Sequence, residues 1–273
     1  MVCIAINTEA LSISFKKSFT HGKTMGIEHI IRVDVSAFVL TVNQLREIPY
    51  LLRGEVEKLK IWLLQPAAAR VVLYSVVIAA GAGMYGAAIG SWRSPLMAAY
   101  VAAKFPLILL LTALGNALLN GMLAQLIGLG ASFRQVSLAI LMSFAITAAI
   151  LGAFSPIVYF MVLNLPPLSP DYHNDFAYAL LMVSQVAIIA FAGITANVRL
   201  LQLLQELSGG KALALKVLVA WLGGNLLLGM QLTWILRPFF GNPDLPVQFL
   251  RANAFQGNFI EGLIGVIQSL YIR

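Results

Sequence analysis

Long apolar stretches separated by short polar segments dominate the pattern along the chain. Five stretches contain no Asp, Glu, Lys or Arg, and they cover residues 71–92, 105–133, 135–170, 176–198 and 217–236. A helix needs about 20 mostly apolar residues to cross the hydrocarbon core of a bilayer. Every stretch reaches that length, so the pattern predicts an all-α, polytopic bundle of about five transmembrane helices.

The third stretch is too long for one straight span, and Ser155-Pro156 interrupts it. Because a proline inside a helix loses a hydrogen bond and kinks or ends the helix, we expect this span to end near Gly152. The apolar piece from Pro156 to Leu165 would then lie in the interface or against neighbouring helices. The expected spans are 70–90, 105–127, 134–153, 176–198 and 213–236.

The spans divide the chain into an N-terminal cytoplasmic or interfacial segment (1–66), a transmembrane bundle (67–236) and a C-terminal tail (237–273). The amphipathic pattern of residues 49–64 predicts a helix on the membrane surface, or a cytosolic helix packed on the N-terminal segment. In the tail, apolar side chains recur at helical spacing between Phe259 and Leu270. They predict a second interfacial helix or a helix that binds a partner.

Local signals mark two helix ends. Ser132 and Gln135 have the spacing of a capping box, which would begin the third span. Ser208-Gly209-Gly210 has the composition of a helix C-terminus and would end a polar helix after the fourth span.

The distribution of Lys and Arg predicts the orientation. Residues 1–70 and the connections after the second and fourth spans hold 13 Lys and Arg, and the opposite side holds five. Cytoplasmic loops carry the excess of these residues. We therefore expect the N-terminus in the cytoplasm and the C-terminus outside. The location that we expect for this integral membrane protein is the bacterial inner membrane.

Composition narrows the class of protein. Hydrophobic residues make up 60% of the chain and charged residues 11%, against about 25% charged residues in soluble domains. This balance excludes a soluble globular enzyme and a disordered protein. The net charge of +7 is interpreted as marking the cytoplasmic face, so no nucleic-acid partner is expected.

Residues for chemistry are few. The one cysteine, Cys3, excludes an internal disulfide and cysteine-rich metal sites, and the three histidines show no ligand spacing. We expect no metal and no cofactor. No carboxylate lies inside an expected span, and no histidine lies there to activate Ser143 or Ser184. The sequence therefore predicts a non-enzymatic protein.

Amide side chains are the polar groups inside the expected spans. Asn116 and Asn120 lie one helical turn apart, Gln185 lies in the fourth span and Asn225 in the fifth. They could form a polar path or a ligand site between helices. They could equally bond to one another and join the helices, which is the interpretation that we favour.

Small residues crowd two spans. They are Gly81, Gly86 and Gly90 in the first span and Gly223 and Gly224 in the fifth. Small side chains let helix backbones approach closely. The contact could lie within this bundle, or it could join the chain to a second copy or another protein.

Four residues at connections are candidates for contact with a partner or a lipid: Arg134, Gln135, Arg237 and Pro238. A charge at Arg134 could clamp the N-terminal helix or a lipid phosphate. The alternative, which we favour, is a basic residue that only anchors the cytoplasmic side.

The run Leu126-Ile-Gly-Leu-Gly-Ala-Ser-Phe-Arg-Gln135 resembles a loop of prokaryotic Yip-domain membrane proteins, as does Leu63-Leu-Gln-Pro66 before the first span. The resemblance covers roughly residues 60–155. It departs where Gly128-Leu129-Gly130 replaces adjacent glycines, and the Asp-Leu-Tyr-Gly-Pro run of eukaryotic members is absent. The resemblance implies a five-span, non-enzymatic membrane protein and supplies no catalytic residues.

Two functions remain in competition. The first is a scaffold or accessory subunit that contacts membrane lipids and binds other membrane proteins or a second copy of itself. The second is a small-solute transporter or channel with a polar path near Asn116 and Asn120.

Overall fold

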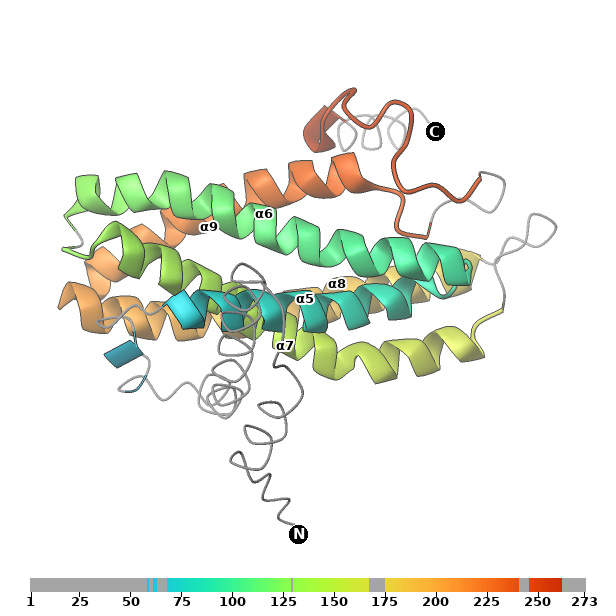
Figure 1. The fold of residues 1–273 in the computed structure, drawn as a ribbon, viewed down its shortest axis with the longest axis horizontal. Coiled ribbons are helices and arrows are strands. Elements are labelled where there is room, and N and C mark those ends of the chain that lie inside the picture. The colour runs from blue at the N-terminus through green and yellow to red at the C-terminus, as the bar shows by residue number, and fades with distance from the viewer. Residues whose placement is uncertain are drawn as a thin grey trace, which may run out of the picture.

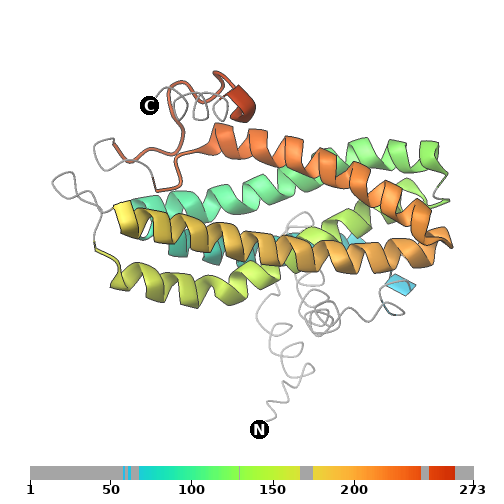
Figure 2. The same cartoon turned by 180° about the vertical axis from the view of Figure 1, so that it is seen from behind.

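The computed structural model describes residues 58, 61–62, 68–128, 130–166, 175–240 and 246–261. Across these residues the fold consists of long helices and contains no strand (Figure 1 and Figure 2). The helices are α5 (Ala68–Gly90), α6 (Pro95–Ile127), α7 (Phe133–Asn164), α8 (Asp175–Ser208) and α9 (Lys211–Leu236). All five are long and apolar enough to cross a membrane. The predicted all-α, polytopic fold is therefore confirmed, and the chain is an integral membrane protein.

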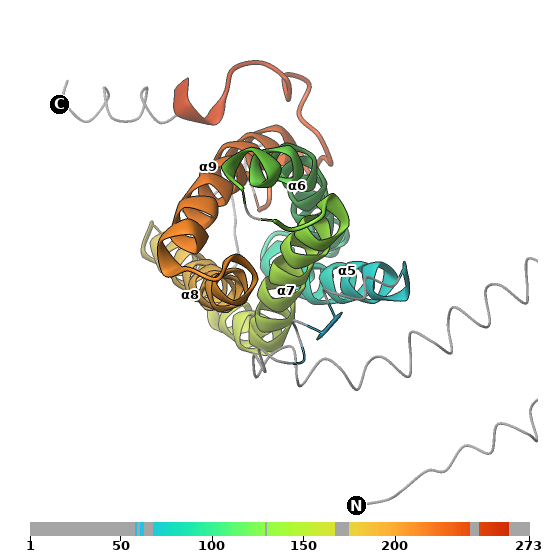
Figure 3. The same cartoon turned by 90° about the vertical axis from the view of Figure 1, so that its left-hand side faces the viewer.

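Four of the helices form a ring, in which α6, α7, α8 and α9 follow one another around the bundle axis (Figure 3). Helix α5 packs against α6 and α7 and projects from the ring at the end that faces the viewer in Figure 3. The α6–α7 and α8–α9 connections lie at one end of the bundle, which we call the Arg134 end (Figure 1). The α5–α6 connection lies at the other end, the Trp92 end. Which end faces the cytoplasm remains a prediction from the basic residues.

Burial is unequal among the helices. In the most apolar 18-residue stretch of α5 and of α7, 56% of the residues are buried inside the bundle. The corresponding share is 22% in α8 and in α9. The core contains Tyr74 from α5, Ile146 from α7 and Trp221 from α9, and each side chain is almost completely covered. Helices α8 and α9 consequently turn large apolar surfaces outward, where lipid covers them in a membrane.

Helix α7 corrects the predicted break at Ser155-Pro156. It runs without interruption from Phe133 to Asn164 with Pro156 inside it, so the third span does not end near Gly152. Pro156 has no N–H to donate to the carbonyl oxygen of Gly152, four residues earlier. The Ser155 hydroxyl donates to that same oxygen at 2.7 Å. A side-chain donor thus replaces the missing backbone bond, as happens in membrane helices that contain proline.

Helix α6 corrects the predicted start of the second span. It begins at Pro95, ten residues before the expected start at residue 105. The Ser94 hydroxyl accepts a hydrogen bond from the Met97 N–H at 3.1 Å, and Pro95 suits the first helical position because its missing N–H costs nothing there. Lys104 lies inside the helix and is completely buried, so its charge does not mark the end of a span.

The helix ends predicted from local signals are confirmed. Ser132 caps α7 with both hydrogen bonds of a capping box, including a 2.8 Å bond from its N–H to the side-chain oxygen of Gln135. Helix α8 ends at Ser208, and Gly209 follows with φ of +65°, a backbone conformation that favours glycine. The helix predicted over 49–64 lies almost entirely outside the described residues. Of the predicted tail helix, residues 259–261 are described and are helical.

Candidate functional site

The amides of α6 and α9 form one hydrogen-bonded chain across the helix interface. The Asn116 side chain donates to the side-chain oxygen of Asn225 on α9. Asn120 donates in turn to the side-chain oxygen of Asn116 at 3.0 Å. Asn116 and Asn120 are almost completely buried. Their amides therefore bond to one another and join two helices.

A glycine makes room for this amide chain. A Cβ atom placed on Gly224 would lie 2.6 Å from the side-chain oxygen of Asn116, so the Asn116 amide would have to shift. Gly224 therefore lets α9 approach the buried Asn116 amide. Two sets of residues that the sequence singled out separately, the glycines of the fifth span and the amides of the second, meet at this point.

Gln185 on α8 has a partner that the sequence analysis missed. The Tyr85 hydroxyl on α5 donates to its side-chain oxygen, and both side chains are buried. The amide nitrogen of Gln185 has no hydrogen-bond partner among the described residues. A tyrosine in the middle of an expected span was the available signal, because buried Tyr hydroxyls normally find a partner.

Gly81, Gly86 and Gly90 of α5 pack closely against other helices of the bundle. A Cβ atom on Gly81 would collide with the Ala148 carbonyl of α7, and one on Gly86 would collide with the Val101 carbonyl of α6. A Cβ atom on Gly90 would lie 2.7 Å from the Met97 carbonyl oxygen. Gly223 differs, because nothing lies within 4 Å of the position of its Cβ atom.

Lys104 is held by the segment that follows α9. Its ammonium group donates to the Pro238 carbonyl oxygen at 2.6 Å. The same nitrogen lies 5.2 Å from the ring centre of Phe249 and 5.9 Å from that of Phe239. These are distances at which a cation is attracted to an aromatic face. The sequence analysis missed this site because its members are far apart along the chain.

Two arginines at the Trp92 end flank Trp234. The guanidinium carbon of Arg237 lies 3.2 Å from the ring centre of Trp234, and that of Arg251 lies 5.7 Å from it. Arg251 also donates to the Trp234 carbonyl oxygen at 3.3 Å. Burial and the neighbouring charge of Arg251 lower the pKa of the Arg237 guanidinium. Arg237 and Pro238, both predicted contact residues, thus stabilise the segment after α9.

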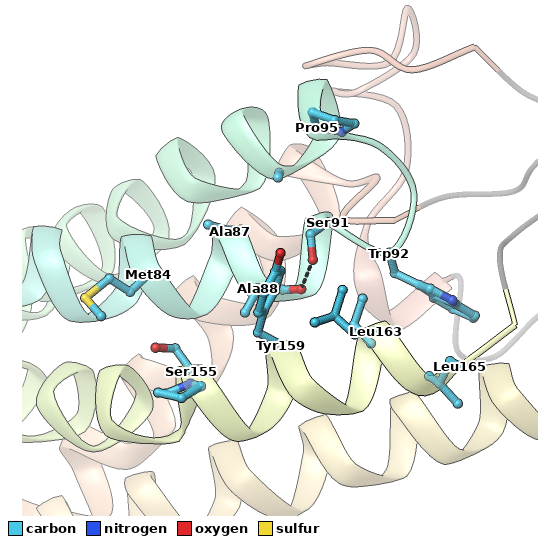
Figure 4. A pocket seen from close by; sticks show the side chains of 13 residues that line it. Met84, Ala87, Ala88, Ser91, Trp92, Pro95, Ser155, Tyr159, Leu163 and Leu165 are labelled. Carbon is cyan, nitrogen blue, oxygen red and sulfur yellow. Dashed lines mark hydrogen bonds between the residues drawn. The ribbon is translucent and has the colours of Figure 1, made fainter.

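A groove of about 900 Å³ opens at the Trp92 end between α5, the start of α6 and α7 (Figure 4). Met84, Pro95 and Leu163 contribute apolar walls. The Ser91 hydroxyl donates to the Ala88 carbonyl at 2.7 Å, and the Tyr159 side chain rises from α7 toward this end of α5. The groove is amphipathic and carries no charged side chain in its lining.

A second groove, of about 630 Å³, opens at the Arg134 end between α5, α6 and α7. Arg134 lies at its rim in the first turn of α7, and its side chain is exposed. Gln135, the neighbouring candidate, is bonded into the capping box. Arg134 is therefore the predicted contact residue of this connection that stays available to a ligand.

The ionisable residues do not gather into a recognisable catalytic or metal centre in the part of the chain that the structure describes. No group of three His, Cys, Asp or Glu side chains is close enough there to hold a metal ion. The absence of enzymatic activity stays a prediction.

Comparisons of this chain with protein-family models, curated proteins and solved structures found no match. They identify no family, and the resemblance to Yip-domain proteins stays a resemblance. Sequence and structure together establish a five-span helical membrane protein.

Proposed function

We propose that the chain is a non-enzymatic scaffold or accessory subunit, which binds a transmembrane helix of another membrane protein on the outer face of α8 and α9. One observation carries the proposal. Gly193 on α8 and Gly223 on α9 have nothing within 4 Å of the position of a Cβ atom. A glycine inside a helix destabilises it by about 1 kcal/mol relative to alanine. A close helix contact supplied by a partner would offset that cost.

The two glycines lie at similar depth. Gly193 is 15 residues before the end of α8, and Gly223 is 12 residues after the start of α9. At about 1.5 Å per residue, they lie roughly 22 Å and 18 Å from the connection between the helices. Helices α8 and α9 are in contact, and large apolar side chains flank the glycines, including exposed Ile194 and Leu226. The two helices together offer close backbone access and apolar contact area.

The hydrogen bonds among the amides favour a scaffold over a transporter. Polar side chains that line a path for solutes would face an open space. Asn116 and Asn120 are instead buried and bonded to each other, and Asn116 also bonds to Asn225. Their bonds support a structural role between α6 and α9.

Native mass spectrometry after gentle detergent extraction tests the proposal. The wild-type protein should carry a membrane protein in fixed stoichiometry, and the variant with Gly193→Leu and Gly223→Leu should lose it. Ala79 and Ala80 are exposed on α5, so the variant with Ala79→Leu and Ala80→Leu is the matched control and should keep the partner. A wild-type protein that is always extracted alone, or a glycine variant that keeps the partner, would contradict the proposal.

A flux assay addresses the rival function. Proteoliposomes with the wild-type protein should pass small solutes no faster than empty liposomes. Flux that disappears with Asn116→Leu and Asn120→Leu would establish the transporter instead.

A further inference from the structure

The groove at the Arg134 end has the shape and lining of a site for an apolar chain. Its volume of about 630 Å³ falls within the roughly 300–1,000 Å³ range of small-molecule sites. Side chains from three helices make its walls, and they include Val71, Val72, Leu110, Leu114, Leu138 and Leu141. Val71, Val72 and Leu114 are strongly exposed in the protein alone. An apolar occupant from the membrane would cover them.

Arg134 places a positive charge at the rim of this apolar groove. Its side chain is exposed and makes no hydrogen bond or ion pair with another described residue. Arg199, at the same end of the bundle, bonds to Gln202 at 3.3 Å, and Arg70 donates to the Trp62 carbonyl at 3.0 Å. Within the described part of the chain, the guanidinium of Arg134 is thus open to an external anion. A guanidinium binds phosphate through two parallel hydrogen bonds.

Positive charge at this end of the bundle favours an anionic occupant. Arg70 and Lys211 lie at the same end of the bundle as Arg134, together with the acidic Glu206. Basic residues near a membrane surface attract anionic lipids more strongly than lipids without net charge.

We infer that this groove binds an anionic phospholipid from the adjacent leaflet. One acyl chain lies between α5, α6 and α7, and the phosphate bonds to the guanidinium of Arg134. The site is separate from the face of α8 and α9, so the inference does not depend on the proposed function.

Lipid retention by the full-length protein tests the inference. The protein is reconstituted in vesicles of phosphatidylglycerol and phosphatidylcholine in equal amounts, extracted gently and weighed by native mass spectrometry. The wild-type protein should retain more phosphatidylglycerol than phosphatidylcholine. Arg134→Gln should lower that retention about fivefold, as expected for the loss of one basic residue beside the lipid phosphate. Arg199 does not line the groove and bonds to Gln202, so Arg199→Gln should change it little.

Filling the groove tests the position of the acyl chain. Ala117 lines the groove, so Ala117→Phe should remove the bound lipid, and Ala79→Phe on the exposed side of α5 is its matched control. Arg134 is exposed, so Arg134→Gln keeps the test decisive if Ala117→Phe fails to fold. Equal retention of the two lipids by the wild-type protein, or unchanged retention in Arg134→Gln, would overturn the inference. Displacement of the lipid by millimolar glycerol 3-phosphate would assign the site to a soluble phosphate and would overturn it too.

Discussion

The ammonium group of Lys104 on α6 donates a 2.6 Å hydrogen bond to the carbonyl oxygen of Pro238, 134 residues later in the chain. This bond connects a membrane helix to the segment that follows α9. The positive charge lies 5.9 Å from the ring centre of Phe239 and 5.2 Å from that of Phe249. Lys104 therefore anchors the described residues after α9, 237–240 and 246–261, on the Trp92 end of the bundle.

Replacing Lys104 by methionine should release this segment and leave the helices in place. A hydrogen bond to a charged group contributes about 1.5–3 kcal/mol. Hydrogen exchange at the N–H groups of Ala254 and Gln256, which bond to nearby carbonyls within the segment, should become at least about tenfold faster. Lys216 is exposed on α9, so Lys216→Met is the control. Unchanged exchange in Lys104→Met would show that the segment is held by its other contacts.

The Ser155 hydroxyl should stabilise α7 only while Pro156 is present. With Pro156, Ser155→Ala leaves the Gly152 carbonyl without its donor and should cost about 1 kcal/mol of unfolding free energy. With Pro156→Ala, a backbone N–H becomes available to that carbonyl, and the same change should cost only a few tenths of a kcal/mol. The coupling is measured by unfolding titrations in mixed micelles. They compare the wild-type protein, the two single variants and the double variant. Equal costs in both backgrounds would show that the hydroxyl does not replace the backbone bond.

The amide chain should couple α6 to α9. Asn116→Leu removes the group that donates to Asn225 and the oxygen that accepts from Asn120. Hydrogen bonds between membrane helices contribute about 0.6 kcal/mol on average and up to about 1.7, so a cost of about 1–2 kcal/mol is expected. Asn225→Leu should cost much less once Asn116 is already replaced. Asn197 bonds to the Gly193 carbonyl of its own helix, so Asn197→Leu serves as the control and should show no coupling to Asn225.

The number of helices could be predicted from the sequence because each span is a local property of about 20 consecutive residues. The capping box at Ser132 could be predicted for the same reason. The start of α6 could not be predicted from gaps between charges. The partner that keeps Lys104 inside the helix is Pro238, and nothing in the local pattern near Lys104 shows that contact.

The path of α7 was predicted wrongly although its signal was local, since Ser155 directly precedes Pro156 and supplies the missing donor. The pairing of amides was expected, but which amides meet depends on how the helices pack. The sequence could not separate glycines that face another helix, such as Gly81, from those that face open space, such as Gly193.

The space beside the two glycines differs, and this difference predicts opposite effects of alanine at Gly81 and Gly193. A Cβ atom on Gly81 would collide with the backbone carbonyl of Ala148, and Gly152 lies against Gly81 from the other helix. Because backbone atoms cannot move aside cheaply, Gly81→Ala should destabilise the bundle by about 1–3 kcal/mol. Gly193→Ala meets open space and should stabilise α8 by up to about 1 kcal/mol through helix propensity alone. Unfolding of the purified, partner-free protein measures both changes. A destabilising Gly193→Ala would mean that the space beside Gly193 is not open, whereas a neutral Gly81→Ala would mean that α5 and α7 do not pack at this crossing.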